Sequence, residues 1–152
     1  MAIITLHTFI NSDCQVCFDF ARDIDLHKES LEHSNEKAIA GKISGLIELG
    51  EWVTWEAKHL GIKQKLTSKI VAFDAPNYFV DEMVSGAFKS FRHEHLFREK
   101  DGGTLMIDNF HFESPLGIFG RFVNWLFLKK YMTNLLKQRN QFLKGKIETS
   151  GI

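Results

Sequence analysis

Two histidines, separated by one residue and flanked by aromatic side chains, are the residues of this sequence best suited to chemistry. His93 and His95 lie in the segment FRHEHLF, with Phe91 and Phe97 at the next alternate positions. Side chains two residues apart point to the same side of a β-strand, so a strand here would present both imidazoles together. Two such imidazoles can ligate a metal ion, exchange protons with a substrate, or form the polar part of a ligand pocket.

The turn that follows the histidines predicts which residues face them. Asp101-Gly102-Gly103 is a turn signal, and a loop of residues 100–103 sets the register of a hairpin. The face that carries the histidines then holds four Phe and one Met, so we expect it to point inward. Its cross-strand pairs are His95 with Asp108, His93 with Phe110, Phe97 with Met106, and Phe91 with Phe112.

Metal binding would require more ligands than the two imidazoles. Asp108 could serve as a third ligand or as the carboxylate that orients a histidine, and His59 or Glu82 could contribute from another strand. The sequence has no HExxH motif and no second ligand cluster, so we expect no metal site and no cofactor. Two interpretations remain open: the histidines are buried and satisfied by hydrogen bonds, or they orient an apolar ligand together with Asp108. A carboxylate beside an imidazole also permits acid–base chemistry.

Two further segments contribute to the expected wall. In residues 51–61 the alternation places Trp55 on the same face as Val53, Ala57 and His59, so Trp55 is a candidate wall residue.

In residues 77–86 the orientation depends on the length of the following loop. A two-residue turn at Gly86-Ala87 would place Glu82 opposite Phe91 and inward, which makes Glu82 the candidate. A three-residue loop would instead turn Phe79, Asp81 and Met83 inward.

The elements that position these residues follow from the change in periodicity along the chain. Residues 3–10 are rich in β-branched side chains and predict a strand, and residues 14–21 and 26–33 predict two short helices. Six extended segments with short connections follow over residues 36–114, which favours antiparallel neighbours. We therefore predict an α+β fold: a seven-stranded curved antiparallel sheet wrapped around a long C-terminal helix, with two short helices after the first strand.

The predicted long helix begins near residue 116, after the plausible N-cap and first-turn pair Ser114-Pro115. Its expected apolar stripe is Phe119, Val123, Phe127, Tyr131 and Leu135, and Leu128 and Phe142 widen it. The helix also carries seven basic residues and no acidic one between positions 116 and 146, namely Arg121, Lys129, Lys130, Lys137, Arg139, Lys144 and Lys146. A solvated basic face is the simplest interpretation, while transient contact with a membrane surface or a homodimer are alternatives.

Composition limits the class of protein. The chain has 152 residues with a net charge of zero and 44% apolar residues, which fits one globular domain and argues against disorder. The first 13 residues lack a basic region and an unbroken apolar run, so we expect no signal peptide and a cytoplasmic protein. The pair Cys14 and Cys17 resembles a redox motif, but the strands that follow are antiparallel hairpins. No motif indicates nucleic-acid binding.

Four segments carry a resemblance to a known superfamily: FDFARDIDLH, VTWEAKHLG, FVDEMVSGAFKSFRHEH and ESPLGIFGRFVNWLFLKKYM. They resemble bacterial single-domain members of the START-like, or SRPBCC, superfamily, and the order of elements agrees over essentially the whole chain. That superfamily has the helix-grip fold and includes pollen-allergen-like proteins, lipid-transfer domains and polyketide cyclases. The resemblance implies a hydrophobic or amphipathic ligand between the sheet and the long helix, without indicating a reaction.

We predict that residues 1–152 form one START-like domain that binds a small hydrophobic or amphipathic ligand, such as a lipid or a polyketide-like aromatic. The alternatives are an enzyme of polyketide cyclase or dehydratase type, with His93, His95 and Asp108 as candidate catalytic residues, and a membrane-docking lipid or quinone carrier. The expected ligand contacts are Trp55, Glu82, Phe91, His93, His95, Phe97, Met106, Asp108, Phe110, Phe127 and Tyr131.

Overall fold

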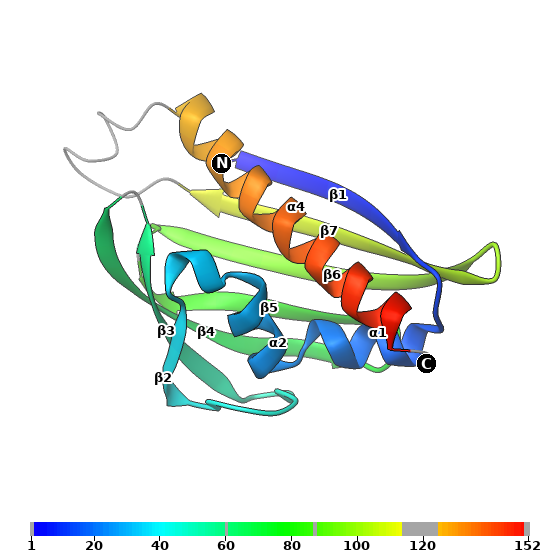
Figure 1. Cartoon of the computed structure of the whole chain (residues 1–152). Coiled ribbons are helices and arrows are strands. Elements are labelled where there is room, and N and C mark those ends of the chain that lie inside the picture. Colours follow the sequence, from blue (N-terminus) through cyan, green and yellow to red (C-terminus); the bar gives the residue numbers. More distant parts are fainter. Residues whose placement is uncertain (1, 60, 87, 114–124, 151–152) are drawn as a thin grey trace.

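One seven-stranded antiparallel sheet organises the computed structural model, which describes residues 2–59, 61–86, 88–113 and 125–150. The strand order is β1-β7-β6-β5-β4-β3-β2, so the first strand lies beside the last one and every other neighbour follows along the chain. Figure 1 shows the sheet with the long helix α4 crossing it. The strands are β1 (Ala2–Ile10), β2 (Lys37–Gly41), β3 (Trp52–His59), β4 (Ile62–Asp74), β5 (Tyr78–Ser85), β6 (Ser90–Lys100) and β7 (Gly103–Glu113).

Two short helices and a 3₁₀ turn connect β1 to β2. Helix α1 (Cys14–Ala21) begins at the cap Asp13, whose carboxylate accepts a hydrogen bond from the Val16 N–H. Helix α2 (Ile24–Ser30) begins at Asp23 in the same way. It therefore starts two residues before the predicted helix 26–33, and the 3₁₀ turn η1 (Glu32–Ser34) takes up its last positions.

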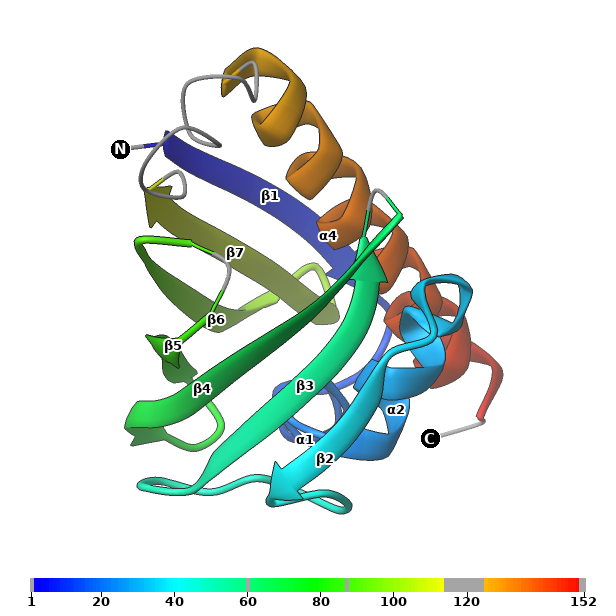
Figure 2. The ribbon, with the colours of Figure 1, turned by 90° about the vertical axis from the view of Figure 1, so that its left-hand side faces the viewer.

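The long helix α4 (Trp125–Thr149) lies against the concave side of the sheet. Figure 2 shows the strands curving around this space, with α1 and α2 at one end of it. The side chains that α4 buries most completely are Leu128, Leu135, Leu136, Arg139, Asn140, Leu143 and Ile147. The Ser114-Pro115 cap, Arg121 and the predicted stripe positions Phe119 and Val123 lie outside the described residues.

The predicted fold class is confirmed, including the two short helices and the terminal helix. The predicted register of the β6–β7 hairpin is also confirmed: all four cross-strand pairs expected on the inner face are present. The turn is as tight as the sequence predicts, since Asp101 and Gly102 both have positive φ, 49° and 80°.

The pairing predicted for β5 and β6 is wrong by one residue. Glu82 lies opposite Arg92 rather than Phe91, and its carboxylate accepts a hydrogen bond from Arg92 at 2.8 Å on the outer face. Asp81 lies opposite His93 and faces inward, which is the alternative that a longer loop predicted. Two contacts favour this register: the outer ion pair of Glu82, and Phe79 stacked on His95 inside.

No helix in the described ranges is both long enough and apolar enough to cross a membrane.

Candidate ligand cavity and its buried polar cluster

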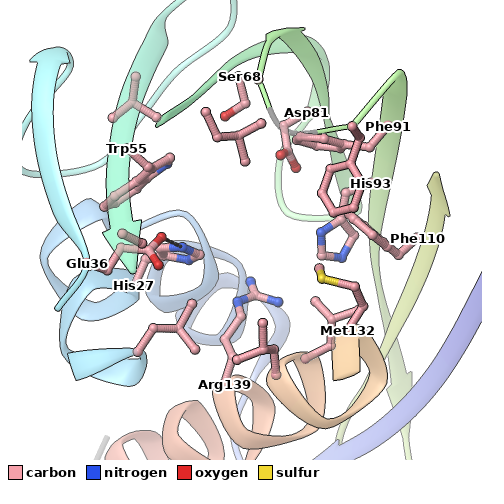
Figure 3. Close-up of a pocket in the computed structure, with 18 of the residues that line it drawn as sticks. His27, Glu36, Trp55, Ser68, Asp81, Phe91, His93, Phe110, Met132 and Arg139 are labelled. Carbon is pink, nitrogen blue, oxygen red and sulfur yellow. Dashed lines mark hydrogen bonds and ion pairs between the residues drawn. The ribbon is translucent and has the colours of Figure 1, made fainter. Parts of the chain in front are cut away.

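A cavity of about 720 Å³ lies between the concave face of the sheet and helices α2 and α4. Figure 3 shows side chains from the sheet and from both helices pointing into it. Most of its lining is apolar, because the inward positions of β3, β4 and β6 and one side of α4 carry large hydrocarbon side chains. Prominent among them are Ile24, Val53, Trp55, Ile70, Phe91, Phe110, Leu128, Met132, Leu135 and Leu136.

The structure brings six of the predicted contact residues to this cavity. They are Trp55, Phe91, His93, His95, Phe110 and Tyr131.

Three others, Phe97, Met106 and Asp108, are buried to 3%, 0% and 0% exposure but do not reach the cavity surface. Phe97 and Met106 belong to the packed core against α1.

The last two predicted contacts lie outside the cavity. Phe127 is 50% exposed, and Glu82 is on the outer face of the sheet. The orientation predicted for Phe127 fails because a spacing of four residues drifts by about 40° per step around a helix of 3.6 residues per turn.

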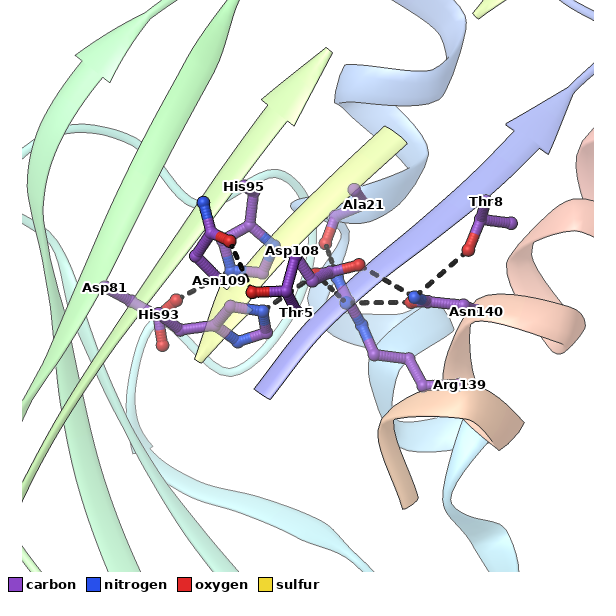
Figure 4. Close-up of polar contacts among 10 residues, drawn as sticks. All are labelled: Thr5, Thr8, Ala21, Asp81, His93, His95, Asp108, Asn109, Arg139 and Asn140. Carbon is purple, nitrogen blue, oxygen red and sulfur yellow. Dashed lines mark hydrogen bonds and ion pairs between the residues drawn. The ribbon is translucent and has the colours of Figure 1, made fainter. Parts of the chain in front are cut away.

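Asp108 is the centre of a buried polar cluster behind the cavity wall (Figure 4). Its Oδ1 accepts a hydrogen bond from His93 Nε2 at 2.8 Å and one from Arg139 Nη1 at 3.3 Å. Its Oδ2 accepts a hydrogen bond from Asn140 Nδ2 at 2.7 Å. Burial by itself would raise the pKa of Asp108, but the hydrogen bond from His93, the close approach of His95 and the charge of Arg139 together outweigh it. The pKa of Asp108 therefore lies well below its usual value, and the carboxylate is ionised.

The two histidines connect this carboxylate to the cavity. Their rings stack with centroids 3.7 Å apart, and His95 Nε2 donates a hydrogen bond to Asp81 Oδ1 at 2.8 Å. Burial, followed by the adjacent His95, lowers the pKa of His93 to about 4, so His93 is neutral near pH 7. Burial would raise the pKa of Asp81, but the hydrogen bond from His95, together with electrostatic attraction from His95, His93 and Arg139, outweighs burial and lowers the pKa. One ring nitrogen, His95 Nδ1, is buried without a hydrogen bond, 3.4 Å from Asp108 Oδ1.

Two other polar pairs reach the cavity, at different places. His27 Nε2 donates to Glu36 Oε1 at 3.1 Å, and the His27 ring lies against Trp55 with centroids 4.5 Å apart. His59 Nδ1 and the Tyr131 hydroxyl are 2.8 Å apart. Within each of these pairs the two side chains are hydrogen-bonded to each other. The group of Asp81, His93 and His95 instead presents an ionised carboxylate, that of Asp81, and a neutral imidazole, that of His93, to the cavity.

The sequence analysis missed Arg139 and Asn140, which hold Asp108 from α4. The sequence pattern groups Arg139 with the basic residues of the helix, but its side chain is 3% exposed and points inward. A signal was available in the sequence, since Arg139 and Asn140 follow Leu135 and Leu136 by one helical turn and precede Leu143 by another. Polar residues at such positions of an apolar stripe indicate buried partners.

Comparisons with known proteins define the class of fold. No protein-family model matches this chain, and no curated protein matches it in sequence. Among solved structures, TTHA0849 from Thermus thermophilus superposes with a TM-score of 0.80 at 17% identity, covering 99% of this chain and 100% of that one. A START superfamily protein from Mycobacterium smegmatis gives 0.74 at 11% identity, covering 97% of each chain. The major latex-like protein 151 of Panax ginseng gives 0.65 at 16% identity, covering 95% of each.

These likenesses agree with the order of elements and with the helix held against a curved sheet. The chain has the same helix-grip fold as these solved structures, one of which is a START superfamily protein.

Proposed function

We propose that the protein binds a small hydrophobic or amphipathic ligand in the cavity between the sheet and α4. The observation that carries this proposal is the cavity, because about 720 Å³ falls within the ~300–1,000 Å³ typical of small-molecule sites. Folded interiors are otherwise packed with few voids larger than a water molecule. An apolar space of this size lowers the free energy of a complex when an apolar ligand fills it.

The distribution of polar groups orients the ligand. Its apolar body would pack between Trp55 on β3 and Leu128 and Met132 on α4, where the lining offers hydrocarbon and aromatic surface. Its polar end would meet Asp81 and His93, which Figure 3 shows across the cavity from Trp55. Because Asp81 is ionised and accepts hydrogen bonds, a hydroxyl, phenol or amine at that end would be recognised.

The test is to fill the cavity and measure binding. In the double variant Ala57→Phe/Ser68→Phe, two rings are added at inward positions of β3 and β4 that line the cavity. The matched control Lys58→Phe/Lys69→Phe adds the same two rings at the adjacent, outward positions. Binding is measured by titration with the fluorescent apolar probe N-phenyl-1-naphthylamine, and native mass spectrometry of the freshly purified protein identifies a copurified ligand.

We expect the filled variant to bind the probe at least tenfold more weakly than the wild type, a difference of about 1.4 kcal/mol. The control variant should bind as the wild type does. Equal probe affinity in the filled variant and in its control, with both folded by circular dichroism, would refute the proposal.

A second candidate function is catalysis of the cyclase or dehydratase type. The observation that favours it is the pair Asp81–His95 at the cavity wall, since a carboxylate hydrogen-bonded to an imidazole is a common arrangement for proton transfer. Once a substrate is identified, Asp81→Asn should lower kcat at least 100-fold while ligand affinity changes little. Ligand binding without turnover in the wild type would exclude this candidate.

A further inference from the structure

Three residues on the cavity wall have the chemistry of metal ligands. Asp81 on β5 lies directly opposite His93 on β6, and His95 is on the same face of β6. One ligand atom from each residue lies within 4.8 Å of the other two. All three side chains line the cavity, so an ion between them would be enclosed by protein on one side and would face the ligand space on the other.

We propose that Asp81, His93 and His95 form a binding site for a divalent transition-metal ion of the Zn²⁺, Fe²⁺ or Co²⁺ type, with its remaining coordination positions open to the cavity. Two imidazole nitrogens and one carboxylate oxygen are a donor set that suits these ions rather than Ca²⁺ or Mg²⁺, which prefer oxygen ligands. Three protein ligands leave at least one position for water or for an oxygen of a bound molecule.

The residues behind the cluster orient the imidazole of His93 for this role. A histidine that ligates a metal almost always donates its other ring N–H to a carboxylate, carbonyl or water, which fixes the tautomer. His93 Nε2 donates to Asp108 Oδ1 at 2.8 Å, so its lone pair is on Nδ1. Asp108 is itself held by Arg139 and by Asn140. The supporting shell of a metal site is therefore already formed around His93.

His95 supplies an independent indication that something is missing from the cluster. In the tautomer that donates Nε2–H to Asp81, the ring has no proton on Nδ1, and that buried nitrogen lies 3.4 Å from Asp108 Oδ1 without a hydrogen bond. Two lone pairs then face each other in a buried site. A metal ion on Nε2 reverses the tautomer, so that the Nδ1–H points toward Asp108 and the conflict is removed.

Charge within the cluster favours the same conclusion. The cluster holds two carboxylates, those of Asp81 and Asp108, and the guanidinium of Arg139 forms an ion pair with Asp108 alone at 3.3 Å. A buried charge without a partner is costly. A divalent cation between Asp81 and the histidines supplies the missing positive charge, and its second charge can be met by a hydroxide or by an anionic oxygen in the cavity.

The geometry requires only a small movement. Asp81 Oδ1 and His95 Nε2 are 2.8 Å apart, and two ligands at about 2.1 Å from a tetrahedral ion are separated by roughly 3.4 Å. The Asp81 side chain is 19% exposed, toward the cavity, and can move away from His95 by this amount. The site thus differs from a closed structural site and leaves room for an exchangeable ligand.

The experiment is metal titration of protein freed of metal by dialysis against a chelator. Co²⁺ binding is followed by its visible absorption bands, which report the coordination number, and Zn²⁺ binding by calorimetry. The variants are Asp81→Asn and His95→Ala. The matched controls are Glu82→Gln on β5 and His111→Ala on β7. They make the same kinds of change, carboxylate to carboxamide and imidazole to methyl, on the outer face of the sheet.

We expect one ion per chain in the wild type and in both controls. Asp81→Asn and His95→Ala should weaken binding at least 100-fold, and Asp108→Asn should weaken it 10- to 100-fold through His93. Zn²⁺ should raise the melting temperature of the wild type and of the controls, but not that of Asp81→Asn.

Three results would overturn the proposal. One is the absence of binding by folded wild-type protein at millimolar Co²⁺ and Zn²⁺. Another is equal binding by the wild type and the two inner variants. The third is an imidazolium signal from His95 in nitrogen NMR with Zn²⁺ present, because it would show that a proton supplies the missing positive charge. Each result is independent of whether the apolar probe binds, so the site and the ligand proposal can fail separately.

Discussion

Replacement of Arg139 by methionine tests whether the buried polar cluster stabilises the fold or is merely tolerated. Methionine keeps most of the length of the side chain, so the change removes the guanidinium with little change in packing. Arg139 is 3% exposed and donates to Asp108, to Asn140 and to the carbonyl oxygen of Ala21. The substitution leaves Asp108 ionised and buried with one charged partner fewer.

The expected loss of stability follows from these contacts. Removal of one partner of a buried ion pair costs about 3–5 kcal/mol, and the donor–acceptor distances of 3.2–3.3 Å place Arg139 near the lower end. We therefore expect Arg139→Met to lower the free energy of unfolding by about 3 kcal/mol. For a chain of this size the corresponding fall in melting temperature is about 6–12 °C.

The assay is urea unfolding followed by circular dichroism, with Lys137→Met as the control because Lys137 is exposed on the same helix. A double-mutant cycle with Asp108→Asn measures the coupling between the two residues. The carboxamide carries no charge, so Arg139→Met should cost less in the Asp108→Asn background. The reasoning is refuted if Arg139→Met costs no more than Lys137→Met, or if the two substitutions are additive within about 0.5 kcal/mol.

Three further predictions concern other parts of the molecule. Gly41 has φ of 76°, and a Cβ there would meet the Trp52 carbonyl oxygen at 2.3 Å, whereas Gly50 has φ of 83° and open space around it. Gly50→Ala should therefore cost about 1–2 kcal/mol and Gly41→Ala clearly more in urea unfolding; equal losses would contradict the contact at Trp52. Burial raises the pKa of Cys17 from 9.0 to about 11, so the fold favours the neutral thiol; the resulting stability is complete below pH 9 and is lost as the pH rises toward 11. Wild-type protein should then lose up to about 2.7 kcal/mol more than Cys17→Ala between pH 8 and pH 11, and parallel pH profiles would argue against this. The start of α4 could contact a membrane surface, because Phe127 is half exposed there beside the exposed Lys130. The fraction of protein that sediments with anionic vesicles should then fall in high salt and in the variant Phe127→Ser/Lys130→Ser. An unchanged fraction under both changes would exclude this contact.

The β6–β7 hairpin could be predicted from sequence because its register depends on local chemistry. Asp101 and Gly102 tolerate the positive φ that a tight turn requires, and the turn fixes every pair along both strands. The inner position of His93 and His95 followed from that register together with the aromatic residues of the same face. The register of β5 could not be predicted in this way, because the sequence allowed two lengths for the loop before β6. A difference of one residue in that loop turns Asp81 inward instead of Glu82.

The contribution of α4 to the site could not be predicted in the same way. A helical pattern shows which positions share a face, but not which sheet residue lies opposite them. Leu128 and Leu135 are separated by about two turns and are both buried, while Phe127 is rotated away by its spacing. Arg139 and Asn140 both donate hydrogen bonds to the carboxylate of Asp108 on β7, which lies 31 and 32 residues before them in the sequence. Contacts of that kind depend on how the helix packs, which local periodicity does not specify.

The contacts of Asp108 have a consequence for the position of α4 along its own axis. Leucine side chains can slide over an apolar surface with little directional preference, whereas hydrogen bonds to a buried carboxylate allow one alignment. A shift of one turn, about 5.4 Å, would bring Leu135 and Leu136, or Leu143, opposite Asp108 and remove both hydrogen bonds that its carboxylate accepts from α4. Thr8 on β1 accepts a further hydrogen bond from Asn140, so the same residues also fix the helix to the edge strand. The polar cluster therefore fixes the position of α4 relative to the sheet. The dimensions of the cavity between helix and sheet then stay the same whether or not a ligand occupies the cavity.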